Sequence, residues 1–253
     1  LRRDAGPPVN VHALQQRLQL FQTDPRIERI NAELKPGEPR GKSVLNVRVA
    51  ERRPIKGWLE YNNFSPPGVG SNRVLGTIVD DNLLGFGDRV SVQYGQSFGT
   101  DVNAHGSGIN PNLNVNYVIP FTPYDTTFAV DYRRTDFSVI DSSVKALDIE
   151  GKFELIGLTF RQPVFRTLSQ EFALSLSGQS ESFRTSLLGN PFEFQSGSTN
   201  GQSQVSALRF AQEYVHRTQD QVISALSRLS FGLPVLGATV NSGSDQATGE
   251  FFS

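Results

Sequence analysis

The chain has 253 residues, and 24 Lys and Arg against 25 Asp and Glu give a net charge of −1 near pH 7. This balance indicates neither a nucleic-acid partner nor an acidic tail. Cys is absent, which excludes disulfides, thiolate metal sites and Cys nucleophiles, and the absence of Met predicts that the chain is an internal piece of a longer protein.

Hydropathy excludes a transmembrane helix but leaves room for membrane strands. The mean hydropathy is −0.31, and no apolar run approaches the roughly 18 residues that such a helix needs. A strand of a membrane barrel needs only about 10 residues with every second one apolar, so it scores as mildly polar on average.

Residues 1–56 differ from the rest in charge and contain the one clear helix pattern. They hold 12 Lys and Arg against 6 Asp and Glu, whereas the remainder holds 12 against 19. Asn10 is a suitable N-cap, and Asp24-Pro25 ends the pattern, because the residue before Pro disfavours the α region. Between them, apolar residues recur at helical spacing: Val11, Leu14, Leu18 and Phe21.

Two short strands are expected next, at 30–34 and 45–49, where apolar and polar residues alternate. Lys35-Pro36-Gly37 forms the turn after the first of them. One helix and one hairpin are too little for an independent core. We therefore interpret residues 1–53 as the C-terminal half of a small α/β domain.

From residue 54 to residue 253 the pattern changes to a period of two, which is typical of β-strands. About nine strands are expected, several of them ten residues or longer. They lie at 55–62, 73–79, 89–94, 113–121, 127–133, 147–155, 171–177, 208–214 and 223–231.

The connections between these strands alternate in length. The turns at 85–88 and 120–123 are tight, whereas 99–112, 189–204 and 237–249 are long, polar and rich in Gly, Ser and Asn. Such alternation is expected of a barrel that has short turns at one end and long loops at the other.

Alternation alone fits both a soluble β-sandwich and a membrane barrel. Strand length, a charged polar face and aromatic residues near strand ends favour the barrel. The aromatic residues are Tyr61, Tyr94, Phe121 and Tyr132. We therefore predict a mainly β protein, a partial transmembrane antiparallel β-barrel of about nine strands from a larger barrel.

Nothing in the sequence forms an enzyme or metal signature. His12, His105 and His216 fall in separate elements, so a histidine-based metal site or catalytic triad has little support. Gly68-Val69-Gly70 begins no βαβ unit and does not predict a phosphate-binding loop. No catalytic residue, metal or cofactor is predicted, and no nucleotide or nucleic-acid partner.

Several segments resemble the two-partner secretion transporters of bacterial outer membranes, the haemolysin activation/secretion branch of the BamA/TpsB superfamily. The resemblance is carried by Asn82 to Asp88 (NLLGFGD), Gly57 to Asn63 (GWLEYNN) and Ser206 to Ser227, with weaker support at Gln162 to Arg166 and Gly249 to Ser253. The helix, Ile30 to Gly37 and Gly41 to Val49 resemble the end of that family's second POTRA domain. Their order and spacing are more specific than any single motif.

The resemblance implies an outer-membrane translocase with POTRA domains in the periplasm. These domains recognise an unfolded secreted exoprotein, which then crosses the barrel without nucleotide hydrolysis, and lipid surrounds the barrel. Three alternatives remain open: a BamA-like insertase, a diffusion porin and a soluble carbohydrate-binding sandwich.

Two sets of residues are candidate sites. An extended partner is expected to add to the strand edge at 43–51 and to rest on the helix, with Leu14, Leu18, Phe21, Leu45, Val47 and Arg48 as the contacts. Leu14, Leu18 and Phe21 also fit a purely structural core. The expected lumen wall comprises Lys56, Glu60, Arg89, Gln93, Asp131, Arg133, Asp148, Glu150, Lys152 and Glu154, whose mixed charge keeps it wetted without a deep binding minimum.

Overall fold

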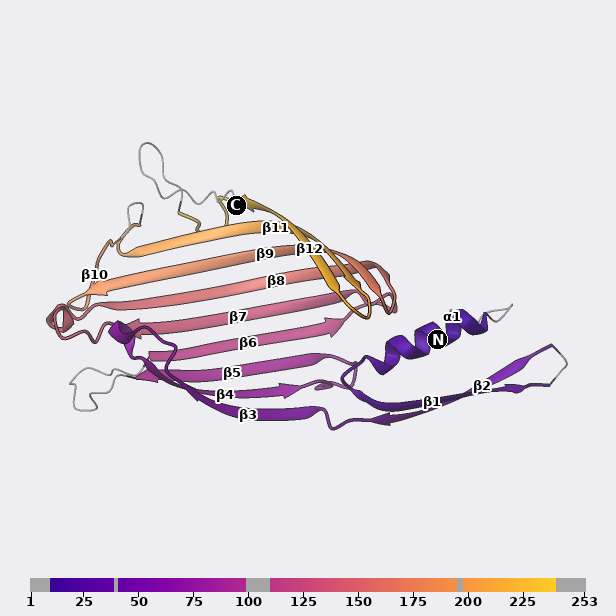
Figure 1. Ribbon diagram of the computed structural model, residues 1–253. Helices are drawn as coiled ribbons and strands as arrows, with labels where there is room; N and C mark the ends of the chain where they lie inside the picture. The colour runs from indigo at the N-terminus through magenta and orange to yellow at the C-terminus, as the bar shows by residue number, and fades with distance from the viewer. Residues whose placement is uncertain (1–9, 39–40, 99–109, 195–197, 240–253) are drawn as a thin grey trace.

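The computed structural model describes residues 10–38, 41–98, 110–194 and 198–239. Of the residues discussed above, His105, nearly all of 99–112, part of 189–204 and residues beyond 239 lie outside these ranges. Within them, one helix and a two-stranded hairpin precede one large antiparallel sheet (Figure 1). The prediction of a mainly β chain is confirmed.

The N-terminal elements form a helix–hairpin module, comprising α1 (Val11–Gln22), β1 (Ile27–Pro36) and β2 (Ser43–Glu51). Asn10 caps α1 as expected, because its side-chain oxygen accepts a hydrogen bond from the Ala13 amide at 3.0 Å. α1 packs against β1, and Leu14 and Ile30 are the buried apolar residues of the module. So small a core leaves most of the hairpin exposed.

The large sheet contains ten strands, nine of them in a continuous path and one short strand, β10, beside β9. The strands are β3 (Ile55–Asn62), β4 (Asn72–Asp80), β5 (Arg89–Phe98), β6 (Asn110–Pro120), β7 (Thr127–Ser138), β8 (Glu150–Arg166), β9 (Gln170–Leu187), β10 (Asn190–Pro191), β11 (Gln202–Arg217) and β12 (Val222–Gly232). Sequential neighbours pair throughout the path, so the sheet is a meander whose edge strands are β3 and β12.

The connections segregate to two ends of the sheet. Four short turns follow β4, β6, β8 and β11, and they lie at the end that carries the helix–hairpin module (Figure 1). The longer connections, with the short helices η1 (Pro67–Val69) and η2 (Lys145–Leu147), lie at the opposite end. We call these the module end and the loop end.

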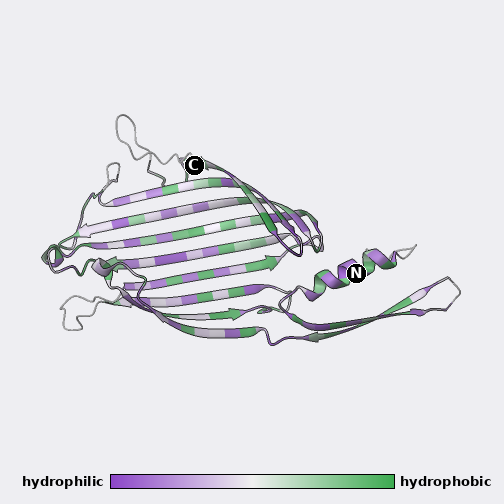
Figure 2. Cartoon of the chain, viewed as in Figure 1, coloured by the Kyte–Doolittle hydropathy of each residue, from purple (hydrophilic) through white to green (hydrophobic). Residues whose placement is uncertain are grey.

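The sheet is curved (Figure 1), and hydrophilic and hydrophobic residues alternate along much of its strands (Figure 2). Its two faces differ in exposure. On the face that bears Lys56 and Trp58, crowding buries Leu75, Thr77 and Val79 although no second layer covers them within the described residues. On the other face Leu59 is 83% exposed and Ile78 is 61% exposed. We call them the concave and the convex face. In the described residues no helix has the length and apolar character to cross a membrane.

Candidate functional site

Six of the ten residues predicted for the polar wall lie on the concave face. The strand register aligns Trp58, Thr77, Gln93, Asn114 and Arg133 in one row across β3 to β7. Neighbouring positions on the same face are occupied by Lys56, Glu60, Arg89 and Asp131.

Side-chain hydrogen bonds and ion pairs join residues of this face. The Asn114 amide donates to the Gln93 side-chain oxygen at 3.0 Å, and the Asn116 amide donates to the Asp131 carboxylate at 2.7 Å. Lys56 forms an ion pair with the buried carboxylate of Asp81 at 2.6 Å, and Arg89 lies 3.5 Å from the same group. A hollow of about 380 Å³ opens between these side chains. The face is polar and structured, with room for water.

The other four predicted residues are not on this wall, which corrects the sequence analysis. Asp148 lies in the connection before β8, in a left-handed conformation with φ of 44°. Glu150, Lys152 and Glu154 are on β8, but the register pairs Lys152 with Asp136 and Glu154 with Arg134, on the convex face. Tyr132, Ile156 and Leu158 share that face.

The error has a physical cause in the sequence of β8. Toward the loop end the concave face is filled by aromatic side chains, and the Phe137 and Phe183 rings stack with centroids 6.1 Å apart. A Cβ at Gly151 would overlap the Phe137 ring, so a side chain there would displace the ring from its present position. Phe153 and Leu155 share this concave face, and the apolar positions move to the convex face at Ile156. The adjacent pair Leu155-Ile156 is the only signal of this change in phase.

A charge network that the sequence analysis missed occupies the concave face near the module end. Arg161 contacts Glu171 at 2.7 Å and Glu213 at 2.9 Å, and Arg166 lies 3.3 Å from Glu171. Arg161 follows the segment where the predicted strand ended, so its face was not assigned. Leu158 and Phe160 alternate with Thr159 and Arg161 along β8, and this alternation is the signal that assigns Arg161 to the concave face.

The turn between β4 and β5 is built around a buried carboxylate. Asp88 has no exposed side-chain surface. It accepts hydrogen bonds from the amides of Leu84 at 3.1 Å and Phe86 at 3.4 Å and from the Tyr117 hydroxyl at 3.1 Å. Gly85 and Gly87 have φ of 84° and 77°, values that favour glycine. The segment 82–88 is therefore a fixed turn, which contains the tight turn predicted at 85–88.

This turn and its neighbour touch the helix–hairpin module. A Cβ at Gly87 would overlap the Arg26 guanidinium, which is held by Asp24 through two side-chain hydrogen bonds. Arg17 of α1 lies 3.6 Å from Asp125 in the turn between β6 and β7. The module thus rests on the turns of the sheet.

The lowered pKa of Asp88 predicts a contribution to the free energy of unfolding that is lost at acidic pH. Burial raises the pKa of this carboxyl, but hydrogen bonds from Leu84, Tyr117 and Phe86 outweigh it and hold the pKa below its ordinary value. Such a group stabilises the fold above its unfolded-state pKa of about 3.9, and the contribution is lost as pH falls through the folded-state pKa.

We therefore expect the difference in unfolding free energy between the wild type and Asp88→Asn to be constant from about pH 7 to pH 5 and to shrink toward about pH 3. Urea unfolding of the micelle-bound protein at each pH measures it. A difference that does not change with pH would contradict this assignment.

The predicted partner contacts on the module separate into buried and accessible residues. Leu14 is only 3% exposed and therefore belongs to the core of the module, the structural alternative stated above. Leu18, Phe21, Leu45 and Val47 are half-buried, and Arg48 is exposed. Within the described residues β2 pairs with β1 alone, so its other edge has free main-chain groups.

The family model of the haemolysin secretion/activation protein ShlB/FhaC/HecB matches residues 41–251. No curated protein sequence matches the chain.

Solved structures share the fold at low sequence identity. CdiB from Escherichia coli has a TM-score of 0.76 at 19% identity, covering 98% of this chain and 45% of that chain. CdiB from Acinetobacter baumannii has a TM-score of 0.62 at 14% identity, covering 89% and 40%. BamA from Haemophilus ducreyi lacking POTRA domains 1–3 has a TM-score of 0.58 at 15% identity, covering 90% and 43%. The chain thus spans less than half the length of each.

Proposed function

The chain belongs to the haemolysin secretion/activation protein family ShlB/FhaC/HecB, and on that premise we propose that it exports an unfolded secreted partner across the bacterial outer membrane. Its family and structural neighbours are outer-membrane β-barrel transporters or insertases, not enzymes. The observation that carries the proposal is the pairing of a family match over 41–251 with a curved sheet whose concave face is polar.

In this proposal the sheet is part of a closed barrel and the concave face lines its lumen. Exposed apolar side chains on the convex face support this, because their exposure is unfavourable in water but not in the hydrocarbon that surrounds a membrane barrel. Lys56, Glu60, Arg89, Gln93, Asp131 and Arg133 then form the wetted wall, joined by Arg161 and Glu213. Lys56 is paired with Asp81 and Arg161 with Glu213, and charges of both signs are interspersed on this wall, so a passing chain meets no strong binding site.

The helix–hairpin module is the C-terminal part of a POTRA domain and faces the periplasm. Its position beside the short turns supports this, since outer-membrane barrels keep short turns on the periplasmic side. The partner adds as a strand to the free edge of β2, gaining main-chain hydrogen bonds. Its side chains rest on Leu18 and Phe21, the half-buried residues of α1, while Arg48 adds positive potential.

Leu18→Asp is expected to reduce partner crosslinking to the module by roughly tenfold, because a charge would then be buried against the apolar partner side chains. Gln19→Asp adds the same charge on an exposed position of α1 and is the matched control. Crosslinking is measured on the intact protein in its membrane, with protease resistance of the module as a test of its folding. Equal crosslinking in the two variants would contradict a groove at Leu18.

A BamA-like insertase is the second candidate, favoured by the structural match to BamA. The two functions differ in what is lost when the protein is deleted. A secretion transporter fails to export one partner while other barrels assemble normally, whereas loss of an insertase depletes many outer-membrane proteins. Quantifying both in one deletion strain tests the proposal.

A further inference from the structure

The convex face is stratified along the long strands β8, β9 and β11. Toward the module end its rows are mostly apolar: Phe160, Leu176 and Phe210 form one row, and Phe165, Phe172 and Tyr214 form another. The row between them contains Gln162, Leu174 and Gln212. Toward the loop end, the residues on the convex face become polar. One of these polar rows contains Arg134, Glu154, Ser182 and Gln204, and the next row outward contains Asp136, Lys152, Arg184 and Gln202.

Strand geometry places the row of Lys152 and Arg184 just beyond a hydrocarbon layer. Convex apolar residues on β8 extend from Ile156 to Phe165, with Gln162 as the one polar residue between them. This span is about 30 Å along the strand and about 25 Å along the membrane normal at the usual tilt. Lys152 lies four positions beyond Ile156, about 10 Å further along the normal, at the depth of lipid headgroups.

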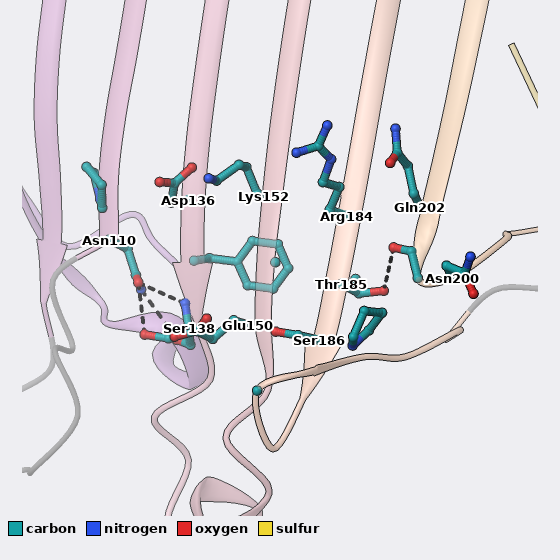
Figure 3. A pocket seen from close by; sticks show the side chains of 16 residues that line it. Asn110, Asp136, Ser138, Glu150, Lys152, Arg184, Thr185, Ser186, Asn200 and Gln202 are labelled. Carbon is teal, nitrogen blue, oxygen red and sulfur yellow. Dashed lines mark hydrogen bonds between the residues drawn. The ribbon is translucent and has the colours of Figure 1, made fainter. Parts of the chain in front are cut away.

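Two cations in this row have no ion-pair partner among the described residues. Arg134 contacts Asp136 at 2.9 Å and Glu154 at 3.8 Å. The carboxylates that neighbour Lys152 in these two rows are therefore both paired with Arg134. Lys152 and Arg184 are directly opposite each other on β8 and β9, and neither forms an ion pair or side-chain hydrogen bond there. Figure 3 shows Asp136, Lys152, Arg184 and Gln202 side by side across adjacent strands.

The same residues line a groove of about 720 Å³. A third carboxylate, Glu150, also lines it, but one row further from the apolar band, opposite Ser186. The free cations therefore face the membrane side of the groove and the free carboxylate faces the loops. This polarity suits an anionic group that approaches from the lipid.

We propose that Lys152 and Arg184 bind the phosphate of a phosphorylated glycolipid in the outer leaflet of the membrane, with Gln202 as an additional hydrogen-bond donor. Lys and Arg side by side supply a point charge and a planar fork for phosphate oxygens. The acyl chains of the same lipid lie on the adjacent apolar rows. The inference rests on the proposed placement of the convex face in lipid with the loop end outward.

The test is binding of diphosphorylated lipid A, and of the same lipid without phosphates, to the intact protein in detergent micelles. We expect Lys152→Gln/Arg184→Gln to weaken binding of the phosphorylated lipid about tenfold. Arg29→Gln/Lys42→Gln removes the same two charges from the hairpin and is expected to leave it unchanged. The lipid without phosphates should bind all three proteins equally.

Equal affinity of the wild type for the two lipids would overturn the inference. So would equal losses in the two double variants, or displacement of the lipid by inorganic phosphate alone at the same concentration. If the glutamine variant does not fold, binding to the wild type still tests the inference. Its preference for the phosphorylated lipid must fall as the salt concentration rises, and a preference independent of salt would overturn the inference. Binding needs no secreted partner, so a failure of export leaves this result unaffected, and the reverse also holds.

Discussion

Val47→Pro is expected to reduce export of the secreted partner by roughly tenfold or more, whereas Val47→Ala retains most of it. Both changes remove the branched isopropyl group of Val47. Only proline removes the main-chain N–H and adds a ring at the strand edge. The comparison therefore isolates main-chain pairing with the partner from side-chain contact.

The hydrogen-bond pattern of the hairpin selects Val47 for this test. Gly37 donates its amide to the Lys42 carbonyl at 2.9 Å, so these two residues form a hydrogen-bonded pair. Bonded and non-bonded pairs alternate along an antiparallel ladder. Counting from that pair, Val47 opposite Ala32 is a non-bonded pair, and its N–H points to the free edge of β2. Proline is tolerated on an edge whose N–H faces outward.

Asn46→Pro is the matched control for damage to the hairpin itself. Asn46 opposite Glu33 is a bonded pair by the same count, so proline there removes a bond to β1. We expect Asn46→Pro to increase protease sensitivity of the module and Val47→Pro to leave it unchanged. Export is measured as partner released into the medium relative to barrel in the membrane. Full export by Val47→Pro would rule out strand addition at this edge.

The helix and most strand faces could be predicted from sequence because local physics determines them. Asn10, the apolar spacing from Val11 to Phe21 and Asp24-Pro25 each act within a few residues, and the helix observed is Val11–Gln22. Likewise, apolar and polar residues alternate on β6 from Leu113 to Tyr117 and on β7 from Val130 to Arg133, because one face meets apolar surroundings along these segments. Where one face of a strand meets the same surroundings along its length, a period of two in the sequence is sufficient to predict which residues lie on that face.

Prediction failed where the surroundings of one face change along a strand. β8 and β9, of 17 and 18 residues, are longer than the apolar band, so beyond Ile156 the same convex face becomes polar while Phe153 fills the concave side. Local sequence cannot reveal that Phe137 and Phe183 lie beside Phe153, since those contacts join three strands. The buried role of Asp88 likewise depends on Tyr117, which is 29 residues away.

Asp88→Ala is expected to have the largest effect on stability, because it leaves the Leu84 and Phe86 amides and the Tyr117 hydroxyl without their acceptor. Unpaired buried donors cost about 1–3 kcal/mol each, so a total loss of about 3 kcal/mol in unfolding free energy is a moderate expectation. The same turn supports Arg26 through Gly87. Its loss therefore loosens the junction between the helix–hairpin module and the sheet.

Asp220→Ala is the matched control, since Asp220 is exposed in the corresponding turn between β11 and β12. Urea unfolding of the micelle-bound protein at neutral pH is expected to separate the two variants, with Asp220→Ala within about 0.5 kcal/mol of the wild type. Limited proteolysis between 52 and 54 reports the junction, where the Asp81 amide donates to the Pro54 carbonyl at 3.1 Å. Faster cleavage is expected in Asp88→Ala alone. Equal stability of the two variants would show that the turn, although built around a buried carboxylate, does not hold the module in place.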